Sequence, residues 1–254
     1  MESLRIFLPI VSLACPTLTY SGDSSVTMAS PRRPGLQARW EYVFDSLESI
    51  IPIYETGSSR IALFSDSRMR DEVVKFAVGG PGLVLDLGSG PGTMARVVGR
   101  SGGTPVLVDA SRRMLLAAGS ELMVQAAFEA LPFRDGAFSS VVAGFSLRDS
   151  QDLFIAVGEV RRVTADGGRF ALCDLGKPDS FLKAVVLGAY IRVGVPVIGV
   201  ITGGRAGLGF VSLYDTYLLT MKNGFLSALL GTRFSSVDLR ARQLGGSITV
   251  CCRA

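Results

Sequence analysis

The sequence predicts an α/β fold: a seven-stranded, mostly parallel sheet with helices on both faces and an antiparallel C-terminal edge. Three observations predict it. Short apolar runs alternate with amphipathic stretches between residues 82 and 175, and parallel strands covered on both faces are apolar in this continuous way. Glycines follow most of the amphipathic stretches, as is typical of helix ends. The C-terminal "FSSVDLRARQLGGSITVCCRA" reads as two antiparallel strands at the sheet edge. The pattern is Rossmann-like.

The N-terminal third is expected to be an extension followed by a helical lid. Residues 1–27 combine a short apolar run with a polar linker and are interpreted as a disordered extension; a targeting segment is the alternative. Helices are expected at 38–56, broken at Pro52, and at 66–78, capped by Asp66. The expected domains are thus 1–27 as extension, 28–80 as lid and 81–254 as the main domain.

The alternating region follows in chain order. The expected strands are 83–88, 105–110, 122–128, 138–145 and 169–175, and the expected helices are 91–103, 111–121 and 151–168. In such sheets ligands bind at the carboxyl ends of the strands. Asp86, Asp109, Gly144 and Asp174 occupy those ends.

A very apolar segment, residues 181–221, interrupts the domain before its last strands. Arg192 and Pro196 divide it, so no transmembrane helix is predicted. Two interpretations stay open for the insertion at about 181–225. One is a buried helix with a cap over the active site; the other is an apolar pocket or membrane-facing surface for a lipid substrate.

Composition excludes several classes of protein. The chain has no histidine, which excludes Ser-His-Asp and Cys-His hydrolases and most zinc sites. Its four cysteines lack metal-ligand spacing, which favours a reduced cytoplasmic setting and predicts no metal. The net charge of +4 is spread along the chain rather than clustered, so no nucleic-acid partner is expected.

The motif that indicates a ligand-binding site is "DLGSGPG", residues 86–92, at the end of the first expected strand. A dinucleotide site needs G-x-G-x-x-G, but Thr93 stands at the last glycine position. An acidic residue ahead of the loop would repel pyrophosphate and suits an ammonium or sulfonium ligand. Asp109 follows Gly88 by 21 residues, where a carboxylate can accept both hydroxyls of a ribose. The two carboxylates therefore predict S-adenosylmethionine; a plain tight turn at the loop and a helix cap at Asp109 are the structural alternatives.

Successive segments resemble the motifs of class I S-adenosylmethionine-dependent methyltransferases. They are "VLDLGSGPG", "LVDASRRML", "FEALPFRDGAFSSVV" and "GEVRRVTADGGRFALCDLGKP". "FSLRDS" at 145–150 and "DLGKPDS" at 174–180 are similar to motifs of the ubiquinone/menaquinone biosynthesis C-methyltransferase family, as are "IIPIYE", "VGVPVIGVITGG" and "YDTYL". The resemblance covers roughly residues 42–250.

The resemblance implies a cofactor site and a catalytic group. The residues implied to bind S-adenosylmethionine are Asp86, Gly88, Ser89, Gly90, Pro91, Gly92, Asp109, Ala110, Ala127, Phe128 and Gly144. Ala127 departs from the family's Asp or Asn, which removes a side-chain acceptor for the adenine amino group. Asp149 stands where the family has Asn.

Carbon methylation of a quinol ring requires that a ring hydroxyl lose its proton, which makes the ring carbon electron-rich. With no histidine, Arg148 is the candidate to stabilise phenolate charge and Asp149 to orient the proton acceptor; a mere salt bridge between them is the alternative. Tyr54 is expected to close the lid, and Tyr217 to line the substrate pocket.

The predicted function is C-methylation of a polyprenyl quinol precursor. Two alternatives stay open: a methyltransferase for another small hydrophobic acceptor, and a cofactor-binding subunit without catalysis. The expected partner is a small hydrophobic substrate, with peripheral membrane contact and a homodimer left open. The expected location is the cytoplasm, with the membrane periphery as a variant.

Overall fold

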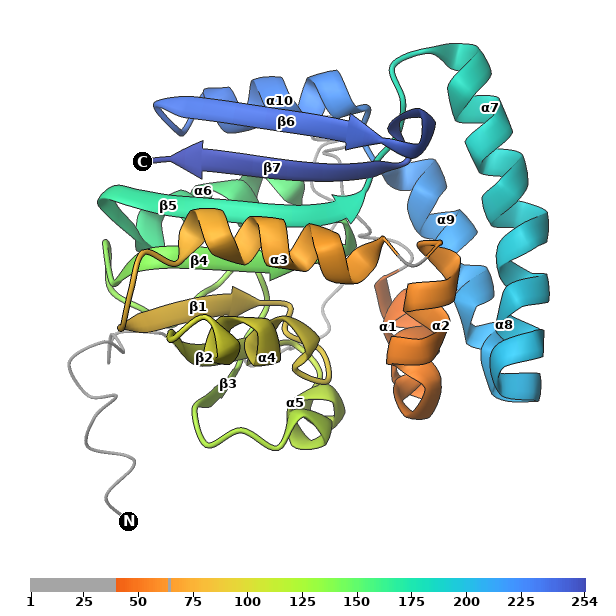
Figure 1. The fold of residues 1–254 in the computed structure, drawn as a ribbon, viewed down its shortest axis with the longest axis horizontal. Coiled ribbons are helices and arrows are strands. Elements are labelled where there is room, and N and C mark those ends of the chain that lie inside the picture. Colours follow the sequence, from red (N-terminus) through yellow and green to blue (C-terminus); the bar gives the residue numbers. More distant parts are fainter. Residues whose placement is uncertain (1–39, 64) are drawn as a thin grey trace, which may run out of the picture.

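The computed structural model describes residues 40–63 and 65–254, so the expectation for residues 1–27 lies outside the described residues. Seven strands form one sheet in the order β3-β2-β1-β4-β5-β7-β6 (Figure 1). Their bounds are β1 Leu83–Leu87, β2 Thr104–Asp109, β3 Met123–Gln125, β4 Phe138–Gly144, β5 Thr164–Leu175, β6 Ser236–Arg242 and β7 Ser247–Arg253. The first five pair in parallel, and β7 pairs antiparallel with β5 and β6. The predicted fold class is confirmed.

Helices cover both faces and build a separate layer at one end of the sheet (Figure 1). On one face lie α3 Asp66–Ala77, α4 Thr93–Arg100 and α5 Arg112–Ala118; on the other lie α6 Leu153–Val163 and α10 Asn223–Gly231. The end layer contains α1 Trp40–Ser49, α2 Tyr54–Ile61, α7 Phe181–Ala189, α8 Val195–Gly203 and α9 Ser212–Leu219. Short 3-10 turns η2 (Ile51–Ile53), η3 (Leu147–Asp149), η5 (Gly204–Val211) and η6 (Gln243–Gly245) and a π-turn η4 (Tyr190–Gly194) connect them.

Strand periodicity decides which side chains face each core. Leu85 and Leu87 of β1 are buried in the core beneath α6. Val84 belongs to the core beneath α3 and α4. Because side chains alternate along a strand, Asp86 shares the α3 face with Val84. An acidic group therefore lies inside one of the two cores, where burial must be compensated.

The strand order reverses between β1 and β4, which is the topological switch point. β1, β2 and β3 wind outward in one direction, while β4 and β5 wind in the other. The carboxyl ends of β1 and β4 consequently diverge into a crevice, where open α/β sheets bind ligands. The loops after these two strands carry "GSGPG" and "FSLRD".

Two local expectations are wrong. Asp66 is not a helix cap: Ser65 holds the cap position, and the Asp66 carboxylate accepts a hydrogen bond from Ser59 (3.0 Å). Residues 164–168 do not extend the helix to a glycine stop. They begin β5, because Thr164 pairs with Phe138 across a register shift that accommodates the extra glycines.

The apolar insertion also differs from one expectation. α7, η4 and α8 run on without a break, and Pro196 falls in the first turn of α8, where its missing N–H costs little. No residue of α7 is buried, so the interpretation as a buried helix is wrong. Within the described residues, one helical stretch, Phe181–Leu219, is long and apolar enough to cross a membrane by length and composition, and 17% of its most apolar window is buried.

Candidate active site

The glycine loop after β1 is shaped by close contacts as well as by backbone conformation. Gly88, Gly90 and Gly92 all have positive φ, at 62°, 53° and 80°, a region that side chains disfavour. A Cβ on Gly88 would collide with the Ser146 side chain from the loop after β4. Ser146 in turn donates a hydrogen bond to the Leu87 carbonyl (2.7 Å). The loop after β1 therefore packs directly on the loop after β4.

Asp109 ties the glycine loop to the next helix. Its carboxylate accepts hydrogen bonds from the Gly90 N–H (2.8 Å) and the Ser111 N–H (2.8 Å). The cap of α5 is Ser111, which accepts from the Met114 N–H, so Asp109 does not itself cap the helix. Burial raises the pKa of Asp109, while these two N–H donors lower it.

A small cavity of about 90 Å³ lies between this loop and the first helix. Gly88, Gly90, Asp109 and Ala110 form its floor, with Ala127 and Phe128 beside them. The opposite wall comes from α1 and includes Trp40, Val43, Phe44, Leu47 and Glu48. The Glu48 carboxylate accepts a hydrogen bond from Ser111 and pairs with Arg113 (3.1 Å), which holds α1 against the start of α5.

Asp86 and Arg70 are two buried charged residues near this loop, and no ion pair joins them in the part of the chain that the structure describes. Neither carboxylate oxygen of Asp86 has a hydrogen-bond partner within the described residues, and the same is true of Arg70 Nε. Burial raises the pKa of Asp86 to about 7, and the nearby Arg70 guanidinium opposes that rise. Buried groups with unused hydrogen-bonding capacity are expected where a ligand supplies the partner.

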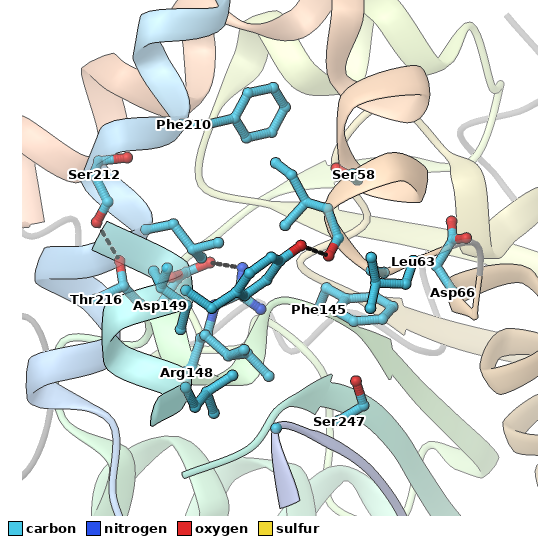
Figure 2. A pocket seen from close by; sticks show the side chains of 18 of the residues that line it. Ser58, Leu63, Asp66, Phe145, Arg148, Asp149, Phe210, Ser212, Thr216 and Ser247 are labelled. Carbon is cyan, nitrogen blue, oxygen red and sulfur yellow. Dashed lines mark hydrogen bonds and ion pairs between the residues drawn. The ribbon is translucent and has the colours of Figure 1, made fainter. Parts of the chain in front are cut away.

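A second, larger cavity of about 390 Å³ lies among the helices of the end layer. Apolar side chains dominate its wall, from α1, α7, η4 and α9 among others. Figure 2 shows Arg148 and Asp149 side by side in this cavity, with Phe210 on its far side. An apolar chamber with one polar end suits a hydrophobic molecule that carries a single reactive polar head.

The two cavities meet at five residues that line both of them: Val43, Leu47, Tyr54, Phe145 and Asp149. Phe145 adopts φ of 61° although it is not a glycine. Its ring stacks on the Arg70 guanidinium at 4.9 Å. Backbone strain of this kind is concentrated at functional sites. A molecule in the larger cavity would thus face a molecule in the smaller one across these five side chains.

We refer to the place where the two cavities meet as the junction. The charges there are those of Arg148 and of two carboxylates that it contacts. Arg148 forms an ion pair with Asp174 and a longer one with Asp149 (3.6 Å). Its backbone N–H also donates to Asp174 (3.2 Å). Burial raises the pKa of Asp149 to about 7, although Arg148 opposes the rise. Burial likewise raises the pKa of Tyr54. Asp149 can therefore exchange a proton near neutral pH.

The structure brings together some of the sequence-predicted site residues. Gly88, Gly90, Asp109, Ala110, Ala127 and Phe128 line the small cavity, and Tyr54, Arg148 and Asp149 line the large one. The remaining candidates, Asp86, Ser89, Pro91, Gly92 and Gly144, do not line either cavity. Tyr217, expected to line the substrate pocket, also stands outside that wall and donates to the Ala184 carbonyl (2.7 Å).

Sequence reasoning missed three residues of this site, Arg70, Phe145 and Glu48, and it placed Asp174 at a strand end without giving it a role. Asp174 carried a signal, because it ends β5 at the same sheet edge as Asp109. Arg70 and Glu48 look like ordinary surface charges on amphipathic helices. Only the packing of α3 and α1 on the loops places Arg70 over the Phe145 ring and Glu48 in the wall of the small cavity.

The fold, the glycine loop and the acidic residue after β2 together define a class I S-adenosylmethionine-dependent methyltransferase. Residues 85–172 match the family described as "Methyltransferase domain". An S-adenosylmethionine-dependent methyltransferase from Thermotoga maritima has the same fold, with a TM-score of 0.59 at 16% identity over 83% of this chain and 99% of that one.

The particular family follows from curated relatives. The chain is 32% identical over 170 residues to the demethylmenaquinone methyltransferase of Thermus thermophilus, an alignment that covers 62% of this chain and 77% of the relative. It is 37% identical over 120 residues to the enzyme of that name from Mycobacterium marinum, covering 46% of this chain and 52% of that one. The chain belongs to the demethylmenaquinone methyltransferase family, is a methyltransferase, and uses S-adenosylmethionine.

Proposed function

We propose that this enzyme methylates a ring carbon of a polyprenyl quinol of the demethylmenaquinol type. The observation that carries the proposal is the junction, where the apolar 390 Å³ cavity meets the glycine-loop cavity at Tyr54 and Asp149. The apolar chamber suits the prenyl tail, and its polar end suits the quinol head. The names of the Thermus and Mycobacterium relatives support the same substrate class.

The cofactor is proposed to bind with its ribose on Asp109 and its adenine between Ala110 and the Ala127–Phe128 pair. Its amino acid end fits the unpaired groups beside the loop. Asp86 offers a negative charge for the ammonium, and Arg70 offers an unused N–H for the carboxylate. Ser89, Pro91, Gly92 and Gly144 are then supporting residues that shape the loop and the strand end.

Bound S-adenosylmethionine supplies an electrophilic methyl group. The protein's part is to orient the acceptor and to remove a proton from its ring hydroxyl. Asp149 is proposed to take that proton, since its raised pKa makes the carboxylate a competent base near pH 7. Arg148 stabilises the resulting phenolate, and the pairing with Asp174 fixes its direction.

The test is transfer of a labelled methyl group from S-adenosylmethionine by the purified full chain. The acceptor is a short-chain demethylmenaquinol kept reduced, with a catechol and a simple amine as competing acceptors. The expected result is a ring-C-methylated quinol. Cofactor binding seen by calorimetry, with no transfer to the quinol, would overturn the substrate assignment. Preferred transfer to the catechol oxygen or to the amine would replace it with another acceptor class.

A further inference from the structure

The outer side of the α7–η4–α8 helix is apolar and exposed. Leu182, Val193 and Ile201 are 71%, 66% and 75% exposed. Val185, Val197 and Val200 are exposed along the same helix. Figure 1 shows α7 and α8 as one column at the edge of the molecule, with α9 and α2 on its inner side. We refer to these six side chains as the outer face.

Helical spacing makes the outer face a single stripe. Leu182 and Val185 are three residues apart, and after one longer step across the π-turn Val193, Val197 and Val200 follow at steps of four and three; Ile201 is adjacent to Val200 and four residues from Val197, so the six lie on one side. On the opposite side of η4 and α8, Ile191 and Val195 pack in a buried apolar cluster with Ile50, Phe210 and Tyr217, and Gly199 lies against Gly207. The helix is therefore attached to the protein through η4 and α8, so it can lie on an apolar phase without being surrounded by lipid.

The charged residues between positions 180 and 214, the segment that contains the outer face, have one sign. Residues 180–214 contain Lys183, Arg192 and Arg205 and no acidic residue. All three basic residues are exposed, and the Arg192 guanidinium lies over the Tyr214 ring at 5.0 Å. Basic residues beside an apolar helix face match an anionic lipid surface. Two copies of this face would instead bring like charges together.

The outer face is continuous with the larger cavity. Val186, next to Val185, is half exposed on the outside and also lines the cavity. Leu187 and Tyr190, on the next turn, line it as well. A hydrocarbon chain could pass from the outer face into the cavity between these side chains without crossing water.

We propose that the outer face docks on an anionic lipid bilayer and that the tail of the acceptor enters the larger cavity directly from the lipid. The second half of this statement rests on the proposed function, whereas the docking does not. α7 and α8 lie along the bilayer surface, with their apolar side chains in the interface and Lys183, Arg192 and Arg205 at the level of the lipid phosphates.

The docking test is flotation of the full chain with vesicles of phosphatidylcholine alone or with phosphatidylglycerol added. The variant Leu182→Glu/Val193→Glu/Ile201→Glu changes three exposed positions, so folding is preserved. Leu116→Glu is the matched control, because Leu116 is 62% exposed on α5, away from the cap. The wild type and the control are expected to float with the anionic vesicles, and binding by the triple variant is expected to fall at least about tenfold.

Three outcomes would overturn the docking: no flotation of the wild type, equal flotation of the triple variant, or a wild-type dimer that the triple variant loses in the absence of lipid.

The entry of the acceptor tail from the lipid, the tail route, is tested separately. The triple variant is expected to keep turnover of a short-chain quinol in solution and to lose turnover of a long-chain quinol embedded in vesicles. Equal loss of turnover on both acceptors would contradict the tail route. Absence of turnover by the wild type on either acceptor would count against the proposed function, and the flotation result would still stand.

Discussion

Asp86 and Asp149 are two carboxyl groups whose pKa burial raises to about 7, yet they do different work. Asp149 lies on the wall shared by both cavities and pairs with Arg148. Asp86 is inside the core beneath α3, next to Arg70 and without a hydrogen bond in the described chain. We propose that Asp149 moves a proton and that Asp86 holds a charge.

The first prediction concerns Asp86 and stability. Its pKa is raised when folded, so its contribution to stability is fully present below the unfolded pKa of 3.8 and is lost as pH rises through about 7. The Asp86→Asn variant has no carboxyl group at this position, so it does not lose stability in this way as pH rises. The free energy of unfolding of the variant relative to wild type should therefore increase between pH 4 and pH 8, by up to about 4 kcal/mol.

Urea unfolding across this pH range measures the effect. Asp71→Asn, an exposed position on the same helix as Arg70, serves as the control and should show no such trend. A difference in the free energy of unfolding between Asp86→Asn and wild type that stays constant with pH would contradict the assignment of a buried, destabilised charge.

The same variant should also bind S-adenosylmethionine more weakly, because Asp86 is proposed to face the ammonium group.

The sequence allows a functional residue to be predicted where a single strand and the loop after it contain the whole motif. The glycine loop and Asp109 are readable because spacing along the chain fixes their positions at a strand end. Arg70, Phe145 and the Arg148–Asp174 pair depend on contacts between segments distant in sequence. Nothing local to α3 distinguishes Arg70 from the exposed charges around it.

At the scale of elements, α1 forms one wall of the small cavity, and we propose that it acts as a lid over the cofactor. Its residues close the small cavity, and Glu48 attaches it to Ser111 and Arg113. The carboxylate is well shielded but Arg113 is exposed, which limits the strength of this pairing to about 1 kcal/mol. The lid is therefore held closed by weak contacts that can open.

The second prediction follows for Glu48→Ala. The loosened lid should lower affinity for S-adenosylhomocysteine by about fivefold. Trp40 is the only tryptophan of the chain and lines the cavity, so its fluorescence reports the titration. Glu41→Ala, an exposed change on the same helix, should leave affinity unchanged. Unaltered affinity in the Glu48 variant would show that the lid does not contribute to cofactor binding.

The third prediction concerns the closest backbone approach in the cap. A Cβ on Gly199 would collide with the Gly207 carbonyl, so Gly199→Ala should separate α8 from η5. KM for the quinol should rise several-fold while cofactor affinity stays the same. Gly158→Ala in α6 is the matched control, because a Cβ there meets nothing within 4 Å. Equal effects of both variants would contradict a specific role of this contact.

Element boundaries were predictable except where tertiary pairing overrides local pattern. The strands β1, β2 and β4 match their apolar runs to within one residue. Residues 164–168 look like a helix end but join β5, because the edge of β4 offers them backbone partners. Pro196 looks like a break, but it falls in the first turn of α8, after the π-turn.

At the scale of the whole molecule, the sheet determines where the chemistry happens. Reversal of strand order between β1 and β4 opens the crevice that holds the glycine loop. The end layer (Figure 1) adds an apolar chamber beside it, lined in part by α1, α7 and α9. The class of fold could be predicted from strand and helix alternation. An apolar pocket was only one of the interpretations left open for the insertion, because the chamber arises only when the insertion packs on α1 and α2.

The central claim is that Asp149, where the two cavities meet, removes the proton that makes a quinol ring carbon nucleophilic. The measurement is the position of a ¹³C methyl group, supplied on S-adenosylmethionine, in the product made by wild type and by Asp149→Asn. Wild type should place it on the ring carbon, with kcat rising as pH passes through about 7. Asp149→Asn should bind the cofactor normally but lose at least about 100-fold in kcat together with this pH dependence. A methyl group on oxygen, or undiminished ring methylation by Asp149→Asn, would contradict the account.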